Sequence, residues 1–122
     1  MKKLLIAASI ILSTSLAFAD GVLKPQHGGI MAEAASGHRV ELVAAAGQLS
    51  VYLTGHDGKP VDTKGVSGDV TVLSGTEKTK VALTPAGANQ LAGKGKAAAS
   101  AKAIVKFMLP GKPAEQVRLA LK

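Results

Sequence analysis

The chain has 122 residues, of which 15 are Lys or Arg and 8 are Asp or Glu, so its formal net charge at neutral pH is +7. It contains no Cys and no Trp, one Tyr and two Phe, which excludes a disulfide framework, thiolate metal ligands and an aromatic platform for stacking nucleobases. This length suits a single domain, whose core must be built mainly from Val, Leu, Ile and Ala.

Residues 1–19 have the pattern of a secretory signal peptide. Lys2 and Lys3 precede an apolar stretch over residues 4–18, and Ala17 and Ala19 place small side chains where a signal peptidase reads them. The stretch is shorter than the roughly 20 apolar residues of a membrane-spanning helix, and no second apolar segment follows. We therefore expect cleavage after Ala19, export to the periplasm of a Gram-negative bacterium, and a mature chain without a transmembrane segment.

After a flexible N-terminal segment over residues 20–29, the chain shows short runs in which apolar and polar residues alternate. Leu49, Val51 and Leu53, for example, share one face of residues 48–54. Pieces rich in Gly, Pro and Asp separate these runs, and the glycine-rich residues 93–101 are predicted to form a loop. Strands are predicted over residues 30–34, 38–43, 48–54, 69–74, 78–84, 89–93, 102–109 and 116–122.

Short strands with one apolar face each are typical of an antiparallel sandwich or a small barrel. No long run with a helical period occurs after the signal peptide. We predict an all-β fold, an antiparallel Ig-like β-sandwich of about seven strands, formed by a single domain over residues 30–122.

Two of the three histidines lie in glycine-containing turns and are the first candidates for metal ligands. His27 precedes two glycines, and His56 begins the turn His56-Asp57-Gly58, so both imidazoles are expected to project from the sheet, with Asp57 as an oxygen ligand or hydrogen-bond acceptor. Solvated histidines and ordinary turn chemistry explain the same residues without a ligand.

His38 and Met31 are further candidates. His38 shares a strand face with Val40, as a histidine at the rim of a core would, while Glu41 points to the opposite face. Met31 suits a soft ion such as Cu(I), although a methionine at a strand start more often packs. Imidazoles, a thioether and carboxylates without thiolates favour copper first, with nickel or zinc as alternatives, but no His-x-His or His-x-x-x-His pair marks a closed site.

Basic residues alternate with apolar ones on the last two predicted strands. Lys102 and Lys106 lie opposite the apolar face of one strand, and Arg118 and Lys122 lie opposite that of the other. If these strands pair as a hairpin, the four cations form one stripe, which could dock on anionic lipid, lipopolysaccharide or an acidic protein. Lysines that keep a sheet soluble would give the same pattern.

Catalytic motifs are weak throughout the sequence. No Ser lies in a Gly-x-Ser-x-Gly elbow, and Gly93-Lys94-Gly95 lacks the remaining residues of a phosphate-binding loop. Any chain with 8 acidic residues offers pairs of carboxylates. We predict that the protein is not an enzyme and has no nucleic-acid partner.

Three segments carry a resemblance to known proteins: His27-Gly28-Gly29, residues 40–43 and residues 51–65. They resemble a group of small uncharacterised periplasmic proteins of Gram-negative bacteria, over most of the mature chain. The first third is also similar to the metal-associated N-terminal segment of heavy-metal efflux periplasmic adaptor proteins. The resemblance implies a secreted β-sandwich with a role in metal handling at His27 and His56, and a metal efflux system as partner. This chain departs from the richest members in having few histidines after the cleavage site, which argues against metal storage.

The leading hypothesis from the sequence is a periplasmic binding module for a divalent or copper ion, an accessory of metal handling or resistance. The alternative is a non-enzymatic envelope module that binds a protein partner or an anionic surface through the basic strands. The two differ in their dependence on solution conditions. Metal binding through neutral imidazoles weakens as pH falls through about 6.5, whereas binding through a basic surface weakens with salt.

Overall fold

The computed structural model describes residues 23–98 and 100–121, which form eight strands. The predicted signal peptide, its cleavage site and Lys122 lie outside the described residues. Each observed strand lies within two residues of its predicted bounds. The strands are β1 (Ile30–Glu33), β2 (Arg39–Ala45), β3 (Gln48–Thr54), β4 (Ser67–Ser74), β5 (Glu77–Pro85), β6 (Gln90–Lys94), β7 (Lys102–Met108) and β8 (Glu115–Ala120).

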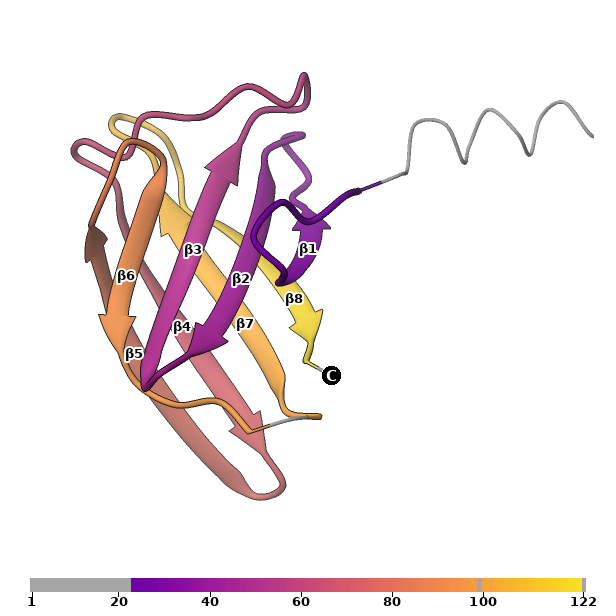
Figure 1. The fold of residues 1–122 in the computed structure, drawn as a ribbon. Coiled ribbons are helices and arrows are strands. Elements are labelled where there is room, and N and C mark those ends of the chain that lie inside the picture. The colour runs from indigo at the N-terminus through magenta and orange to yellow at the C-terminus, as the bar shows by residue number, and fades with distance from the viewer. Residues whose placement is uncertain (1–22, 99, 122) are drawn as a thin grey trace, which may run out of the picture.

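All strand pairs are antiparallel, and the strands follow the order β1-β2-β3-β6-β5-β4-β7-β8 in one sheet. The sheet folds over at the β5–β6 corner, where only Thr84–Ala92 and Pro85–Leu91 are in register. Its two edge strands, β1 and β8, come together on the other side (Figure 1). The predicted antiparallel all-β fold is confirmed, and its strands form one nearly closed, barrel-like sheet instead of two clearly separate sandwich layers.

Alternation places one face of every long strand inside the barrel. On β3, Leu49, Val51 and Leu53 are buried against the interior, and Phe107 of β7 is the largest fully buried side chain. Burial of each such side chain contributes about 1.5–3 kcal/mol, so this aliphatic core stabilises the fold without disulfides. Its other main members are Val40, Leu42, Val70, Val72, Val81, Leu83, Leu91, Val105, Val117 and Leu119.

Hairpin geometry fixes the registers along the sheet. Between β2 and β3 the two-residue loop Ala46-Gly47 has positive φ at both positions, 55° and 74°, the twist that joins antiparallel strands tightly. At the opposite end of the barrel, the buried Thr63 hydroxyl donates a hydrogen bond to the carbonyl oxygen of Gly87 at 2.8 Å. This contact ties the long β3–β4 connection to the β5–β6 turn and closes that end.

Within residues 23–98 and 100–121, no helix is long and apolar enough to cross a membrane.

Candidate functional site

His27 belongs to a short N-terminal segment that lies across the outer face of β2 and β3. Its Nδ1 lies 3.0 Å from Oε1 of Glu41, and its ring stacks on Tyr52. The Glu41 carboxylate also accepts backbone N–H hydrogen bonds from Gln26, His27 and Gly29, at 3.0, 2.8 and 2.9 Å. We call these five residues, Gln26, His27, Gly29, Glu41 and Tyr52, the N-terminal latch.

Glycine is required where the latch meets the sheet. A Cβ at Gly29 would overlap the backbone carbonyl of Leu42 and press on the Val43 side chain. The preceding Gly28 has a φ of 75°, in the left-handed region that glycine adopts without strain. The two glycines after His27 therefore let the backbone approach β2 closely.

The Glu41 carboxylate is almost fully buried, with 2% of its surface exposed, yet it is held in the charged form. Burial raises the pKa of this carboxyl, but the hydrogen bond from His27 and those from the backbone N–H groups of Gly29, Gln26 and His27 lower it by more. The pKa of Glu41 therefore lies below its ordinary value of 4.5. The buried charge of Glu41 therefore holds residues 26–29 against the sheet through these hydrogen bonds.

His56 is anchored to a different carboxylate. Its Nδ1 lies 2.8 Å from Oε2 of Glu33, and the Arg39 Nε donates to the same oxygen at 3.3 Å. The hydrogen bond from His56 lowers the pKa of Glu33, against a smaller opposing effect of burial and with further help from Arg39. Glu33 and Arg39 are register partners on β1 and β2, so this cluster fixes the β3–β4 turn to the edge of the sheet.

His38 directly precedes β2 and lies at the rim of the barrel, as its alternation with Val40 predicts. Its Nδ1 lies 2.8 Å from the Ser36 hydroxyl and 3.4 Å from Oε2 of Glu115, and its ring meets the edge of Phe107. Ser36 also hydrogen bonds to Glu115. Because Glu115 begins β8, these contacts link the β1–β2 turn to the last strand across the seam between the two edge strands.

Each histidine thus has its own glutamate, and the structure does not gather the candidate metal ligands into one cluster. In the part of the chain that the structure describes, no group of three or more His, Asp or Glu side chains is placed to hold a metal ion. Asp57 accepts a hydrogen bond from the backbone N–H of Lys59 at 3.0 Å, which is turn chemistry. Met31 is half-buried on β1 opposite Glu41.

A second feature lies on the outer face of β5, β4, β7 and β8. Three cross-strand rows of outward residues run across this face: Lys78–Leu73–Lys102–Ala120, Lys80–Thr71–Ile104–Arg118 and Ala82–Asp69–Lys106–Gln116. Among the described residues of these rows there are five cations and one carboxylate, that of Asp69, which lies 3.8 Å from Nζ of Lys80. We call this surface the basic face; its cations are Lys78, Lys80, Lys102, Lys106 and Arg118.

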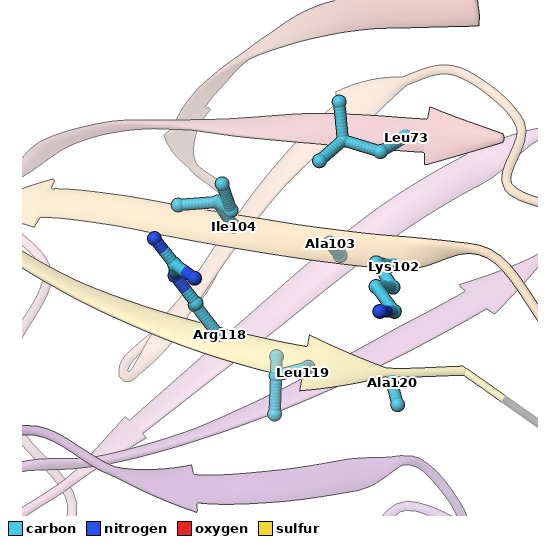
Figure 2. Close-up of a pocket in the computed structure, with 7 residues that line it drawn as sticks. All are labelled: Leu73, Lys102, Ala103, Ile104, Arg118, Leu119 and Ala120. Carbon is cyan, nitrogen blue, oxygen red and sulfur yellow. The ribbon is translucent and has the colours of Figure 1, made fainter. Parts of the chain in front are cut away.

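The basic face contains a shallow depression of about 390 Å³. Figure 2 shows Arg118 reaching from β8 toward Ile104 on β7. Lys102 lies at the start of β7, and Leu73 lies on the neighbouring strand β4. Ile104 and Leu73 are half-buried although they point outward. The depression therefore combines two cations with an apolar floor formed by the side chains of Leu73, Ile104 and Ala120. Ala103 and Leu119 also line it, but their side chains are buried in the core of the barrel.

Sequence reasoning identified Lys102, Lys106 and Arg118 but missed Lys78 and Lys80, which extend the stripe to a face. Their alternation on the strand over residues 78–84 was the available signal. It also missed the partners of the histidines, since Glu33, Glu41 and Glu115 lie 23, 14 and 77 residues from His56, His27 and His38 in the chain.

Comparisons of the chain with models of protein families, with curated proteins and with solved structures find no match.

Proposed function

We propose that this protein is a non-enzymatic binding module that docks on a phosphate-rich membrane surface through its basic face. The observation that carries the proposal is the register of β5, β4, β7 and β8, which places five cations and one carboxylate in the three described outward rows of these strands. The export expected from residues 1–19 would bring this face to membrane leaflets in the periplasm.

The face has dimensions that suit a charged plane. Neighbouring strands lie about 4.8 Å apart and outward residues on one strand about 6.8 Å apart, so the cations are spread over a surface and not gathered at a point. Four of the five side chains that carry them are lysines, which are long enough to reach phosphates at slightly different heights. Near an anionic membrane each cation contributes about 1 kcal/mol, which becomes useful only when several act together.

Vesicle binding tests the proposal. Vesicles of phosphatidylglycerol and phosphatidylcholine are expected to bind the protein, and binding should weaken strongly between low and physiological salt because exposed charges are screened over about 8 Å at 0.15 M. The variant Lys78→Gln/Lys106→Gln should bind about 30-fold more weakly, the equivalent of two cations.

The matched control is Lys59→Gln/Lys64→Gln, which removes two exposed lysines from the β3–β4 connection, away from the basic face. It should retain nearly all of the binding. Equal losses in the two variants, or binding that does not respond to salt, would contradict the proposal.

Metal handling remains a second candidate because of one observation. The Nδ1 atoms of His27 and His56 face glutamates, and that of His38 faces the Ser36 hydroxyl and Glu115. Nε2 of each ring is left for another partner, as in many metal-binding histidines whose other ring nitrogen is held by a carboxylate. An ion on one such imidazole would take its other ligands from a partner protein, as transfer to an efflux system requires.

Isothermal titration of residues 20–122 with Cu(II), Ni(II) and Zn(II) tests this candidate. Saturable binding that is lost in a His27→Ala/His56→Ala variant would support it, with copper expected to bind most tightly. Absence of heat with all three ions, at protein concentrations that detect micromolar binding, would eliminate it.

A further inference from the structure

We infer that the depression on the basic face is a binding site for an amphiphilic phosphate, which is a phosphate monoester or diester carrying an apolar tail. The inference deepens the proposed function and rests on it, because the depression lies within the surface that we propose docks on membranes. It adds recognition of an individual molecule to attraction by a charged plane.

Two cations of the basic face line the depression, one from each strand of the β7–β8 hairpin. Ile104 is the register partner of Arg118, and Lys102 is the partner of Ala120, so Lys102 and Arg118 stand diagonally across the β7–β8 pair on its outer face. Both line the same depression (Figure 2). A guanidinium offers two parallel N–H donors to phosphate oxygens, and an ammonium adds a mobile point charge.

The apolar floor distinguishes this site from a simple anion site. Outward positions on a solvated antiparallel sheet are usually polar, but Leu73 and Ile104 occupy adjacent strands in the middle of the basic face. Ala120, opposite Lys102, leaves the space into which a larger side chain would otherwise project. Inorganic phosphate would contact the cations and leave this apolar surface exposed to water.

The size of the depression is consistent with part of a lipid. Its volume of about 390 Å³ is at the lower end of small-molecule sites, which span about 300–1,000 Å³. We expect it to accept a phosphate head and the carbons next to it, while the rest of an acyl chain stays outside or in a membrane.

The direct test uses dihexanoyl phosphatidic acid, kept below its micellar concentration, and inorganic phosphate as separate ligands in isothermal titration. The lipid should bind saturably and at least about tenfold more tightly than inorganic phosphate, because only the lipid covers the apolar floor. Equal affinity for the two ligands, or no saturable binding of the lipid, would overturn the inference.

Two variants on β7 distinguish binding at the apolar floor from nonspecific hydrophobic binding of the lipid elsewhere on the strand. Ile104→Ser removes one of the two large apolar side chains of the floor and should weaken lipid binding about tenfold or more. Met108→Ser changes an outward and more exposed residue of the same strand, outside the depression, and should leave lipid affinity unchanged. Equal losses in the two variants would contradict the assigned site, and thermal melts of both verify that they are folded.

Vesicles of phosphatidylglycerol distinguish this inference from the proposed function. Salt-dependent vesicle binding without binding of the short-chain lipid would overturn the inference and leave membrane docking standing. Binding of the short-chain lipid without vesicle binding would overturn membrane docking and support a site for free amphiphiles. An Arg118→Gln variant should weaken both, because its guanidinium belongs to the depression and to the basic face.

Discussion

The imidazole of His27 lies parallel to the phenol ring of Tyr52, with the ring centroids 3.6 Å apart and the ring planes inclined by 3°. Tyr52 is the register partner of Glu41, so the same imidazole reaches the carboxylate on the next strand. The first histidine of the chain is thus held by β2 and β3 together. It fixes the N-terminal residues to the sheet while about 40% of its side chain stays exposed.

Replacing Glu41 with Gln should destabilise the fold by about 1–3 kcal/mol, because an amide offers one acceptor oxygen where the carboxylate serves three backbone donors and His27. Urea denaturation measures the loss. Hydrogen exchange at the amides of Gln26, His27 and Gly29 should accelerate in parallel. Glu33→Gln, at an exposed pair, is the control and should cost less than about 1 kcal/mol.

Stability should fall in acid because of the same carboxylate. The pKa of Glu41 is lower in the folded chain than its ordinary value of 4.5, so its charge stabilises the fold fully above about pH 4.5. That contribution is lost as pH falls through the lower, folded pKa. Melting temperatures measured from pH 7 to pH 3 should drop below pH 4.5, and Glu41→Gln should make the curve flatter there. A variant curve parallel to that of the parent protein would refute this origin.

Loss of the His27 ring should change the fluorescence and the NMR signals of Tyr52. The chain has one Tyr and no Trp, so tyrosine emission and the phenol ring resonances report on this stack alone. His27→Ala should shift the Tyr52 ring protons as the neighbouring ring current disappears, and should cost about 0.5–1.5 kcal/mol beyond the lost hydrogen bond. His56→Ala is the matched control. Unchanged Tyr52 resonances in His27→Ala would mean that the rings do not stack in solution.

The β2–β3 hairpin offers a stabilising substitution. Ala46 has a φ of 55°, which strains a residue with a Cβ, whereas Asn tolerates this conformation and precedes Gly in the preferred two-residue turn. Ala46→Asn should therefore stabilise the protein by about 0.5–1 kcal/mol, a rise of several degrees in Tm for a domain of this size. Ala45→Asn, one residue earlier on the strand, should give no gain. Similar Tm changes in both would show that the turn conformation is not the cause.

The strands could be predicted from the sequence because each long strand buries alternate residues. Leu49, Val51 and Leu53 reveal β3 locally, without knowledge of its neighbours. How the strands close could not be predicted, since it depends on the short β5–β6 corner and on the meeting of β1 with β8. These are contacts between segments far apart in the chain, and alternation within one strand carries no information about them.

The candidate site was predicted in part for the same reason. The sequence shows that glycines follow His27, but it does not show that Gly29 lies against the backbone carbonyl of Leu42, because that contact depends on how the segment folds onto β2. The alternation of side chains along a strand correctly predicted that His38 and Glu41 point to opposite faces of the sheet. Glu41 pairs with His27, and His38 pairs with Glu115. The metal role of these residues stays a prediction.

The latch and the basic face lie on opposite sides of the barrel (Figure 1). A copy attached through β4, β5, β7 and β8 would therefore turn residues 26–29 and the His27 ring away from the surface. Attachment would fix orientation as well as position. A population of docked molecules would display the same histidine-bearing side to the surrounding fluid, where a second binding partner could reach it without displacing the first.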